Sequence, residues 1–208
     1  MKIKFYTLWL ALICIIVFIL QNIIPNLTDS LLLNQQSFSQ PYRFITAIFL
    51  HGSLIHIVSN LFALILFGLI LEKLIGSKRF LLVFFSSGII ANIISSFFYP
   101  ASLGASGAIM GIIGTLTIIR PLMAVWAFSL PMPMFLAAII WAIGDILGIF
   151  YPQGTGNIAH LSGLAIGLIL GIYFRVKHKK KQTLRADYSR ISIPESYMQD
   201  WENTWMRR

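Results

Sequence analysis

Long apolar runs separated by short polar stretches form the dominant pattern along the chain. A helix that crosses the hydrocarbon core of a bilayer needs roughly 17–25 predominantly apolar residues, and six segments approach or reach that length. The predicted membrane helices are Tyr6–Ile24, Leu54–Leu71, Phe80–Tyr99, Gly104–Ile119, Met134–Phe150 and Ile158–Phe174. The pattern therefore predicts an all-α membrane protein, built as a bundle of six transmembrane helices.

The fourth predicted helix, Gly104–Ile119, is short for a membrane span. A helix of that length covers about 24 Å at 1.5 Å per residue, against roughly 30 Å of hydrocarbon. Residues 100–103, which precede it, are then expected below the outer membrane surface. Irregular backbone is tolerated at that depth only where protein shields it or where it lines a water-filled cavity. The short helix is thus the first sign of a functional site.

Composition supports the membrane prediction and excludes several classes of protein. Apolar residues make up 57% of the chain and charged residues only 11%, whereas soluble domains carry about 25% charged residues. This excludes a soluble enzyme, a secreted disulfide scaffold and a disordered chain. The single cysteine, Cys14, cannot form an intramolecular disulfide.

The basic residues predict the orientation in the membrane. With six crossings both termini lie on one side, and all 16 Lys and Arg residues except Arg43 fall on that side. Because cytoplasmic segments carry the excess of Lys and Arg, both termini are expected in the cytoplasm. Orientation accounts for the net charge of +9, so no nucleic-acid partner is expected. Arg43 is expected to organise the external loop, and contact with lipid headgroups is the alternative.

Residues 1–175 are predicted to form the membrane domain and residues 176–208 a basic cytoplasmic tail that is attracted to anionic lipid. In the tail, Tyr197, Met198, Trp201 and Trp205 recur at helical spacing. This spacing favours a short amphipathic helix at the membrane interface. A disordered tail with scattered aromatic residues is the alternative.

Polar residues at the outer ends of three predicted helices form the candidate site. His56 and Asn60 are four residues apart and share one face of the second helix. Ser106 is the third residue of the fourth predicted helix, and His160 is the third residue of the sixth. All three helices start at the outer side, so these side chains are expected at one depth. A hydroxyl, an imidazole and two further hydrogen-bonding groups suit acyl transfer.

Two rows of glycines are expected to bring the fourth and sixth helices together. They are Gly104, Gly107, Gly111 and Gly114 on the fourth, and Gly163, Gly167 and Gly171 on the sixth. Small residues let membrane helices approach closely, which can place a serine within hydrogen-bond reach of an imidazole. Glycines that only pack helices are the alternative interpretation, but they leave the matched depth of serine and histidine unexplained.

Several motifs resemble those of the rhomboid intramembrane serine proteases, and the resemblance covers residues 41–171. The matching motifs are G-A-S-G at 104–107 (family G-x-S-G), H-G-S-L-I-H-I-V-S-N at 51–60 (H-x4-H-x3-N), A-H-L-S-G-L-A-I-G at 159–167 (A-H-x-x-G-x-x-x-G), Y-R at 42–43 (W-R) and E-K-L-I-G at 72–76 (E-x-x-x-G). G-x-S-G alone is weak, but three motifs in the right order at the right helix ends are specific.

The resemblance implies a six-helix rhomboid-like fold and a serine–histidine dyad without a third, acidic member. Ser106 is then the nucleophile, and His160 the general base and later the general acid. The backbone N–H of Ser106 and the side chains of His56 and Asn60 are expected to stabilise the oxyanion, with His51 as a supporting residue beside the site.

Further residues around the dyad are expected to support it. Gly104, Gly107 and Gly163 make room for the close helix contact. Met110 stands where the family often has a tyrosine stacked on the catalytic imidazole; a thioether can pack against a ring edge instead. The fifth helix is expected to gate the lateral passage of a transmembrane substrate.

The sequence therefore predicts an intramembrane serine endopeptidase in a prokaryotic cell membrane. It is expected to use no cofactor or metal and to cleave single-span or polytopic membrane proteins near the outer face through an acyl-enzyme. The sequence carries no signal for the oligomeric state. A catalytically silent rhomboid-like protein that binds membrane clients is the alternative, and a transporter is less favoured because no inverted repeat is evident.

Two alternatives concern single residues of the site. His51, His56 and His160 have the ligand types of a three-histidine zinc site, although the serine on a glycine row makes this the poorer explanation. Asp145 is the only acidic residue within a predicted span. It is interpreted as a hydrogen-bonded or protonated residue near the membrane interface rather than as a third member of a triad.

Overall fold

The computed structural model describes residues 3–127, 130–151, 156–190 and 195–206. The chain divides into two compact units, Met1–Phe174 and Arg175–Arg208. The elements in chain order are α1 (Tyr6–Ile23), α2 (Leu27–Leu31), β1 (Leu33–Asn34), η1 (Gln35–Phe38), α3 (Arg43–Thr46), η2 (Ala47–Phe49), α4 (Leu54–Ile75), α5 (Ser77–Ser95), β2 (Ala101–Ser102), α6 (Ser106–Ile119), β3 (Ala124–Ala127), β4 (Leu130–Pro133), α7 (Met134–Phe150), α8 (Asn157–Arg190) and α9 (Glu195–Trp205).

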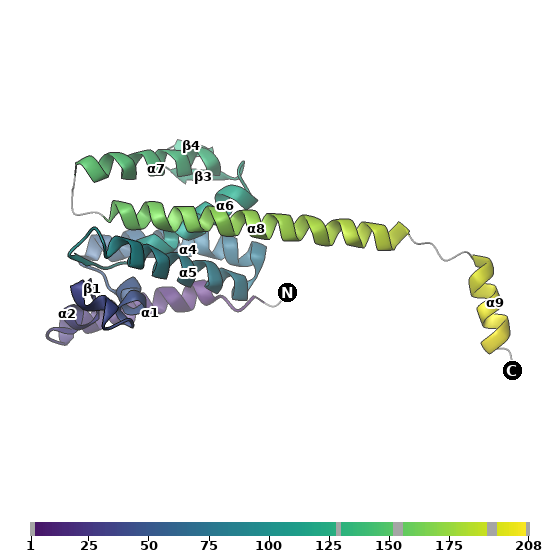
Figure 1. Ribbon diagram of the computed structural model, residues 1–208, viewed down its shortest axis with the longest axis horizontal. Coiled ribbons are helices and arrows are strands. Elements are labelled where there is room, and N and C mark those ends of the chain that lie inside the picture. The colour runs from purple at the N-terminus through teal and green to yellow at the C-terminus, as the bar shows by residue number, and fades with distance from the viewer. Residues whose placement is uncertain (1–2, 128–129, 152–155, 191–194, 207–208) are drawn as a thin grey trace. The chain divides into compact units, whose positions relative to one another are not determined.

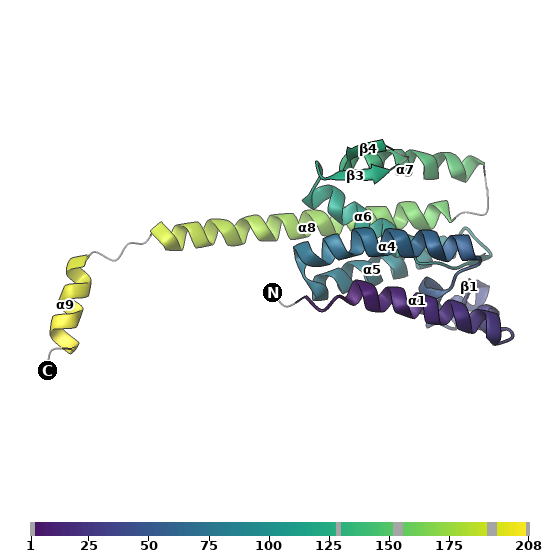
Figure 2. The ribbon, with the colours of Figure 1, turned by 180° about the vertical axis from the view of Figure 1, so that it is seen from behind.

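Within the described residues, four helices are long and apolar enough to cross a membrane: α1, α4, α5 and the part of α8 from Asn157 to Lys177. The two remaining predicted spans are the shorter apolar helices α6 and α7. Helices thus occupy all six predicted segments, and the mostly helical membrane class predicted from the sequence is confirmed. In both views of the first unit, α1 lies at one edge of the helical bundle and α7 with the β3–β4 hairpin at the opposite edge (Figures 1 and 2).

The C-terminal end of α4 extends beyond the predicted boundary at Leu71, and the next residue, Glu72, is buried and paired. Its carboxylate accepts hydrogen bonds from the N–H groups of Tyr6 (2.9 Å) and Thr7 (3.0 Å), at the start of α1, and from the hydroxyl groups of Thr7 (2.8 Å) and Ser77 (2.6 Å). The first N–H groups of a helix lack intrahelical acceptors and favour a negative charge. Glu72 thereby ties the start of α1 to α4.

Gly76 separates α4 from α5 with no intervening loop. Its φ of 86° lies in the left-handed region, which glycine adopts without strain. As a result α5 starts at Ser77 and ends at Ser95, earlier at both ends than the predicted Phe80–Tyr99.

The sixth predicted helix is also longer than expected, because α8 continues past Phe174 to Arg190. Lys, Arg, Gln, Leu and Ala dominate this stretch, and all are favourable helix formers. The second unit contains this part of α8 and α9. The helix α9 covers the segment for which the aromatic spacing predicts a helix.

Protein groups hold the irregular segment before α6, as the short fourth span requires. The strand β2 pairs antiparallel with β1, so that Leu33 lies opposite Ser102 and Asn34 opposite Ala101. Two residues further on, the N–H of Gly104 donates to the carbonyl of Ala47 (2.8 Å). The start of α6 is therefore anchored to the loop that joins α1 to α4.

Arg43 organises that loop, as expected. Its side chain is buried, its Nη1 donates to the carbonyls of Asp29 and Leu32 (2.8 Å each), and its Nε donates to Oε1 of Gln40 (2.7 Å). Because charge-assisted hydrogen bonds are the stronger kind, this network fixes the path of the loop that supports β1.

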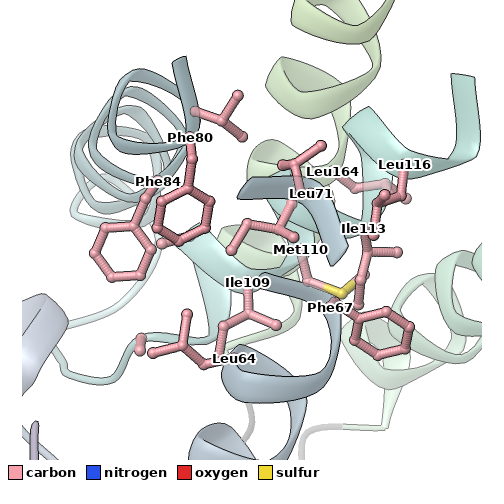
Figure 3. Close-up of a cluster of buried hydrophobic side chains, with 14 of the residues drawn as sticks. Leu64, Phe67, Leu71, Phe80, Phe84, Ile109, Met110, Ile113, Leu116 and Leu164 are labelled. Atoms are coloured by element: carbon pink, nitrogen blue, oxygen red, sulfur yellow. The ribbon is translucent and has the colours of Figure 1, made fainter. Parts of the chain in front are cut away.

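The apolar core surrounds α6, which packs against α4, α5 and α7. Figure 3 shows side chains from several helices meeting in this core; the labelled ones are Leu64, Phe67, Leu71, Phe80, Phe84, Ile109, Met110, Ile113, Leu116 and Leu164. Most of α6 is buried. Ser106, its first residue, therefore stands at the end of the most enclosed of the six helices.

Candidate active site

A cavity of about 360 Å³ lies among α4, α6, α7 and α8. Its lining is mostly apolar, with four polar side chains that can take part in proton transfer or hydrogen bonding. These are Asn60, Ser106, Asp145 and His160. The structure thus brings three of the four predicted polar site residues to one cavity and adds Asp145. The fourth, His56, lies beside it.

The helices that carry the candidate nucleophile and base, α6 and α8, touch each other through their backbones. A Cβ on Gly163 would clash with the carbonyl oxygen of Gly107, and one on Gly167 with that of Gly111. The hydroxyl of Thr115 also donates to the carbonyl of Gly167 across the interface (2.9 Å). The predicted close approach of the two glycine rows is confirmed.

Ser106 is the first residue of α6 rather than the third, because the helix starts later than predicted. Gly104 has a φ of 125° and therefore lies outside the helix. Since the first N–H groups of a helix have no intrahelical acceptor, the N–H of Ser106 is available to a ligand. Ser106 itself is half-buried and lines the cavity.

His160 is the fourth residue of α8 rather than the third, since the helix starts at Asn157. Among the hydrogen bonds of the described residues, none joins its ring to the hydroxyl of Ser106. Catalytic hydrogen bonds are often long in enzymes without substrate and tighten when substrate binds. The shared cavity and the glycine contact, rather than a direct bond, are what bring the two residues together here.

His56 and Asn60 lie against Gly104, two residues before Ser106. A Cβ on Gly104 would stand 2.9 Å from both Cε1 and Nε2 of His56 and 3.8 Å from Nδ2 of Asn60. The N–H of Gly52 donates weakly to Nδ1 of His56 (3.4 Å), so the ring proton is on Nε2, the atom that faces Gly104. Nδ2 of Asn60 is buried without a partner among the described residues. Both side chains thus present hydrogen-bond donors near the start of α6.

His51 stands behind His56 and does not line the cavity. The two rings meet edge to face, with centroids 5.1 Å apart. Nδ1 of His51 donates to the carbonyl of Phe49 (3.2 Å). Burial, and secondarily the charge of His56, lower the pKa of His51 to about 4 against the opposing effect of the Phe49 contact. His51 is therefore neutral at neutral pH, and its supporting role stays a prediction.

Within the described part of the chain, His51, His56 and His160 do not form a group that could hold a metal ion, and neither do other sets of three His, Cys, Asp or Glu residues. Met110 is buried and lines the cavity together with Ser106 and His160.

Asp145 is the site residue whose contact the sequence did not reveal. Its Oδ1 accepts a hydrogen bond from Nδ1 of His160 at 2.9 Å. The expectation of a hydrogen-bonded residue is met, but the partner is the candidate base itself. The signal in the sequence was that Asp145 is the only charged residue of an otherwise apolar helix.

Comparison with known proteins agrees with this architecture. The Rhomboid domain family matches residues 39–177. RHOMBOID-like protein 6, mitochondrial, of Arabidopsis thaliana is 34% identical over 135 residues, which are 64% of this chain and 43% of that protein. RHOMBOID-like protein 1 of Arabidopsis thaliana is 32% identical over 138 residues, covering 65% and 35%.

The Rhomboid protease GlpG of Yersinia pseudotuberculosis is 29% identical over 175 residues, 80% of this chain and 62% of that protein. The matched region thus covers less than two thirds of each of these relatives. The fold, the motifs and the domain match together define an integral membrane protein of the rhomboid type. The chain belongs to the rhomboid family, and the resemblance found in its motifs is confirmed.

Proposed function

We propose that this protein is an intramembrane serine endopeptidase that uses Ser106 and His160 as a catalytic pair. The observation that carries the proposal is the cavity that both residues line together with Asn60, whose buried Nδ2 has no hydrogen-bond partner among the described residues. The family match and the protease named among the relatives support it.

In the proposed reaction, the hydroxyl oxygen of Ser106 attacks the carbonyl carbon of the scissile peptide while His160 takes the hydroxyl proton. The resulting oxyanion accepts hydrogen bonds from the N–H of Ser106 and from the side chains of His56 and Asn60. His160 then gives its proton to the leaving amine as the C–N bond breaks, which leaves an acyl-enzyme on Ser106. Water, activated by His160, hydrolyses this ester and restores the site.

We place both termini in the cytoplasm and the site near the outer face, with six helices crossing a prokaryotic cell membrane. The one-sided distribution of Lys and Arg supports this orientation. In this arrangement residues 1–175 form the catalytic membrane domain, and residues 176–208 a cytoplasmic tail. The exposed Tyr197 and Trp201 of α9 suit a position at the lipid interface.

The proposed substrates are single-span or polytopic membrane proteins, which reach the cavity laterally between α4 and α7. Both helices line the cavity, and on its wall the rings of Phe67 and Trp141 meet edge to face, 6.0 Å between centroids. The two helices meet here through side chains, whereas the start of α7 is held by its backbone, because the N–H groups of Met134 and Phe135 donate to the carbonyls of Met123 (2.8 Å) and Pro121 (3.1 Å). A substrate helix with weak helicity would then extend into the cavity beside Ser106.

The test compares the purified wild-type protein with Ser106→Ala and His160→Ala on a panel of fluorogenic transmembrane substrates and with a fluorophosphonate probe. Wild type is expected to cleave at least one substrate and to be labelled at Ser106. Both variants should stay folded and lose cleavage, and labelling should weaken greatly in His160→Ala. Undiminished cleavage by Ser106→Ala would overturn the proposal. A folded wild type that is neither labelled nor active, yet retains membrane proteins, would favour the client-binding alternative.

A further inference from the structure

The one charged side chain of α7 points at the candidate base. Asp145 lies in a helix whose other residues are all uncharged, and it is paired with Nδ1 of His160 at 2.9 Å. The two side chains are 11% and 18% exposed, so neither is freely solvated. A carboxylate inside a membrane protein is costly and therefore marks function by default.

A second contact, one turn away on both helices, holds this pair in place. A Cβ on Gly148 would stand 2.6 Å from Nδ2 of Asn157, so the buried Asn157 side chain lies directly on the α7 backbone. Gly148 follows Asp145 by three residues and Asn157 precedes His160 by three. Residues at this spacing share a helix face. The approach of Asp145 to His160 therefore results from the packing of α7 on α8 and not from one side-chain rotamer alone.

The pairing decides which ring nitrogen of His160 carries the proton. A carboxylate can only accept, so the Nδ1 that faces it is the protonated nitrogen. Nε2 then has a free lone pair, which is what the transfer of a proton from the Ser106 hydroxyl requires. The side chains of Met110 and Ile109, which also line the cavity, have no anionic group that could accept the hydrogen bond from Nδ1–H of His160.

We propose that Asp145 is a positioning residue for His160, which completes a serine–histidine–aspartate arrangement in this chain. The inference rests on the proposed function and deepens it. When the Ser106 proton moves to Nε2, the imidazole becomes an imidazolium beside the Asp145 carboxylate. The side chain of Asp145 stabilises that charge through its hydrogen bond to Nδ1, and the proton leaves from Nε2 to the amine of the departing peptide.

The test uses Asp145→Ala and Asp145→Asn, with Asp145→Glu as the variant that keeps the carboxylate. For Asp145→Ala and Asp145→Asn, kcat on a transmembrane substrate is expected to fall by about 10² to 10⁴, with KM little changed. Asp145→Glu should recover part of this loss, because it restores an acceptor for Nδ1–H. Thermal denaturation in detergent identifies a variant that merely fails to fold.

A second readout needs no turnover and so separates this inference from the proposed function. The chain has only four histidines, so ¹⁵N-histidine NMR in detergent can follow the His160 ring directly. Wild type, and equally Ser106→Ala, is expected to show the Nδ1–H tautomer of His160. Asp145→Ala should lose that preference, while the signals of His51 and His56 remain as internal controls.

The outcomes separate the two ideas. An unlabelled, inactive wild type overturns the proposed function, while the His160 tautomer still decides whether Asp145 positions the ring. An unchanged kcat or an unchanged tautomer in Asp145→Ala overturns the positioning role. So does a rise in activity, because Asp145 would then be holding His160 away from Ser106.

Discussion

The helices α6 and α7 both contact α8, but in different ways. Backbone meets backbone between α6 and α8, where Gly107 and Gly163 leave no space for a side chain. The contact of α7 with α8 is made by side chains, through Asp145 and through Asn157 against Gly148. Most of α6 is buried, whereas much of α7 is exposed.

This difference separates a fixed wall of the site from an adjustable one. The fixed wall holds the candidate nucleophile and base, whose relative position tolerates little error because misplacement of reacting groups by about 1 Å can cost 10²-fold in rate. The adjustable wall contributes the side of the cavity through which a substrate is proposed to pass. Asp145 belongs to the adjustable wall, so the orientation of His160 is linked to the position of α7.

The largest effect is expected when the fixed contact is forced apart. Gly163→Ala places a methyl group against the Gly107 carbonyl, and overpacking of this kind costs roughly 1–3 kcal/mol. Thermal stability in detergent and substrate cleavage should therefore fall together. The matched change on the adjustable wall is Gly144→Ala, whose Cβ meets no atom within 4 Å. Thermal stability should be kept in that variant, and equal losses in the two variants would contradict the comparison.

The second effect is confined to catalysis, without loss of stability, and concerns the proposed oxyanion donors on α4. Removing one such donor typically costs about 10² to 10³ in kcat, so Asn60→Ala and His56→Ala should be impaired but measurable, with little change in KM. Because both donate to one atom together with the Ser106 N–H, the double variant should lose less than the sum of the single losses. Steady-state kinetics on one transmembrane substrate measure this. A variant that keeps wild-type kcat removes its residue from the oxyanion site.

The smallest effect concerns His51, and it is expected only on acidification. Because its pKa is lowered from 6.5 to about 4 in the folded protein, the unfolded chain binds the proton more readily between these values. Protonation of His51 in the unfolded chain therefore lowers the free energy of unfolding as pH falls from about 6.5 to about 4. At neutral pH it has no influence on stability. The melting temperature of His51→Gln should fall less steeply over this range than that of wild type. Parallel curves would show that His51 is not the group that titrates.

Hydropathy and spacing predicted the helical segments and which residues of α4, α6 and α8 lie close together. Apolar runs define the helical segments. The site motifs were recognisable because each is local in the sequence: the G-x-S-G motif, the His56–Asn60 pair and the glycine row after His160. Local backbone geometry moved the boundaries. The positive φ of Gly104 delays α6 to Ser106, and that of Gly76 lets α5 start at once.

The adjustable wall was harder to predict, for two physical reasons. The residues of α7 itself are apolar on every face of the helix. No amphipathic pattern therefore indicates which way Asp145 faces. The β3–β4 hairpin before it has strands of only four residues, and β4 contains Pro131 and Pro133. Such short strands with prolines carry little periodicity, so the sequence analysis placed no element there.

The buried Glu72 also has a consequence for the biogenesis of the protein. Its partner Tyr6 lies 66 residues earlier in the chain, so a ribosome makes α1 long before α1 can be fastened. Until α4 has been synthesised, α1 is an independent membrane segment with the N–H groups of its first turn unpaired. The completed contact therefore marks a defined stage of assembly. A chain that has not formed this contact leaves the Glu72 carboxylate without these partners, which is costly for a charged group at a membrane.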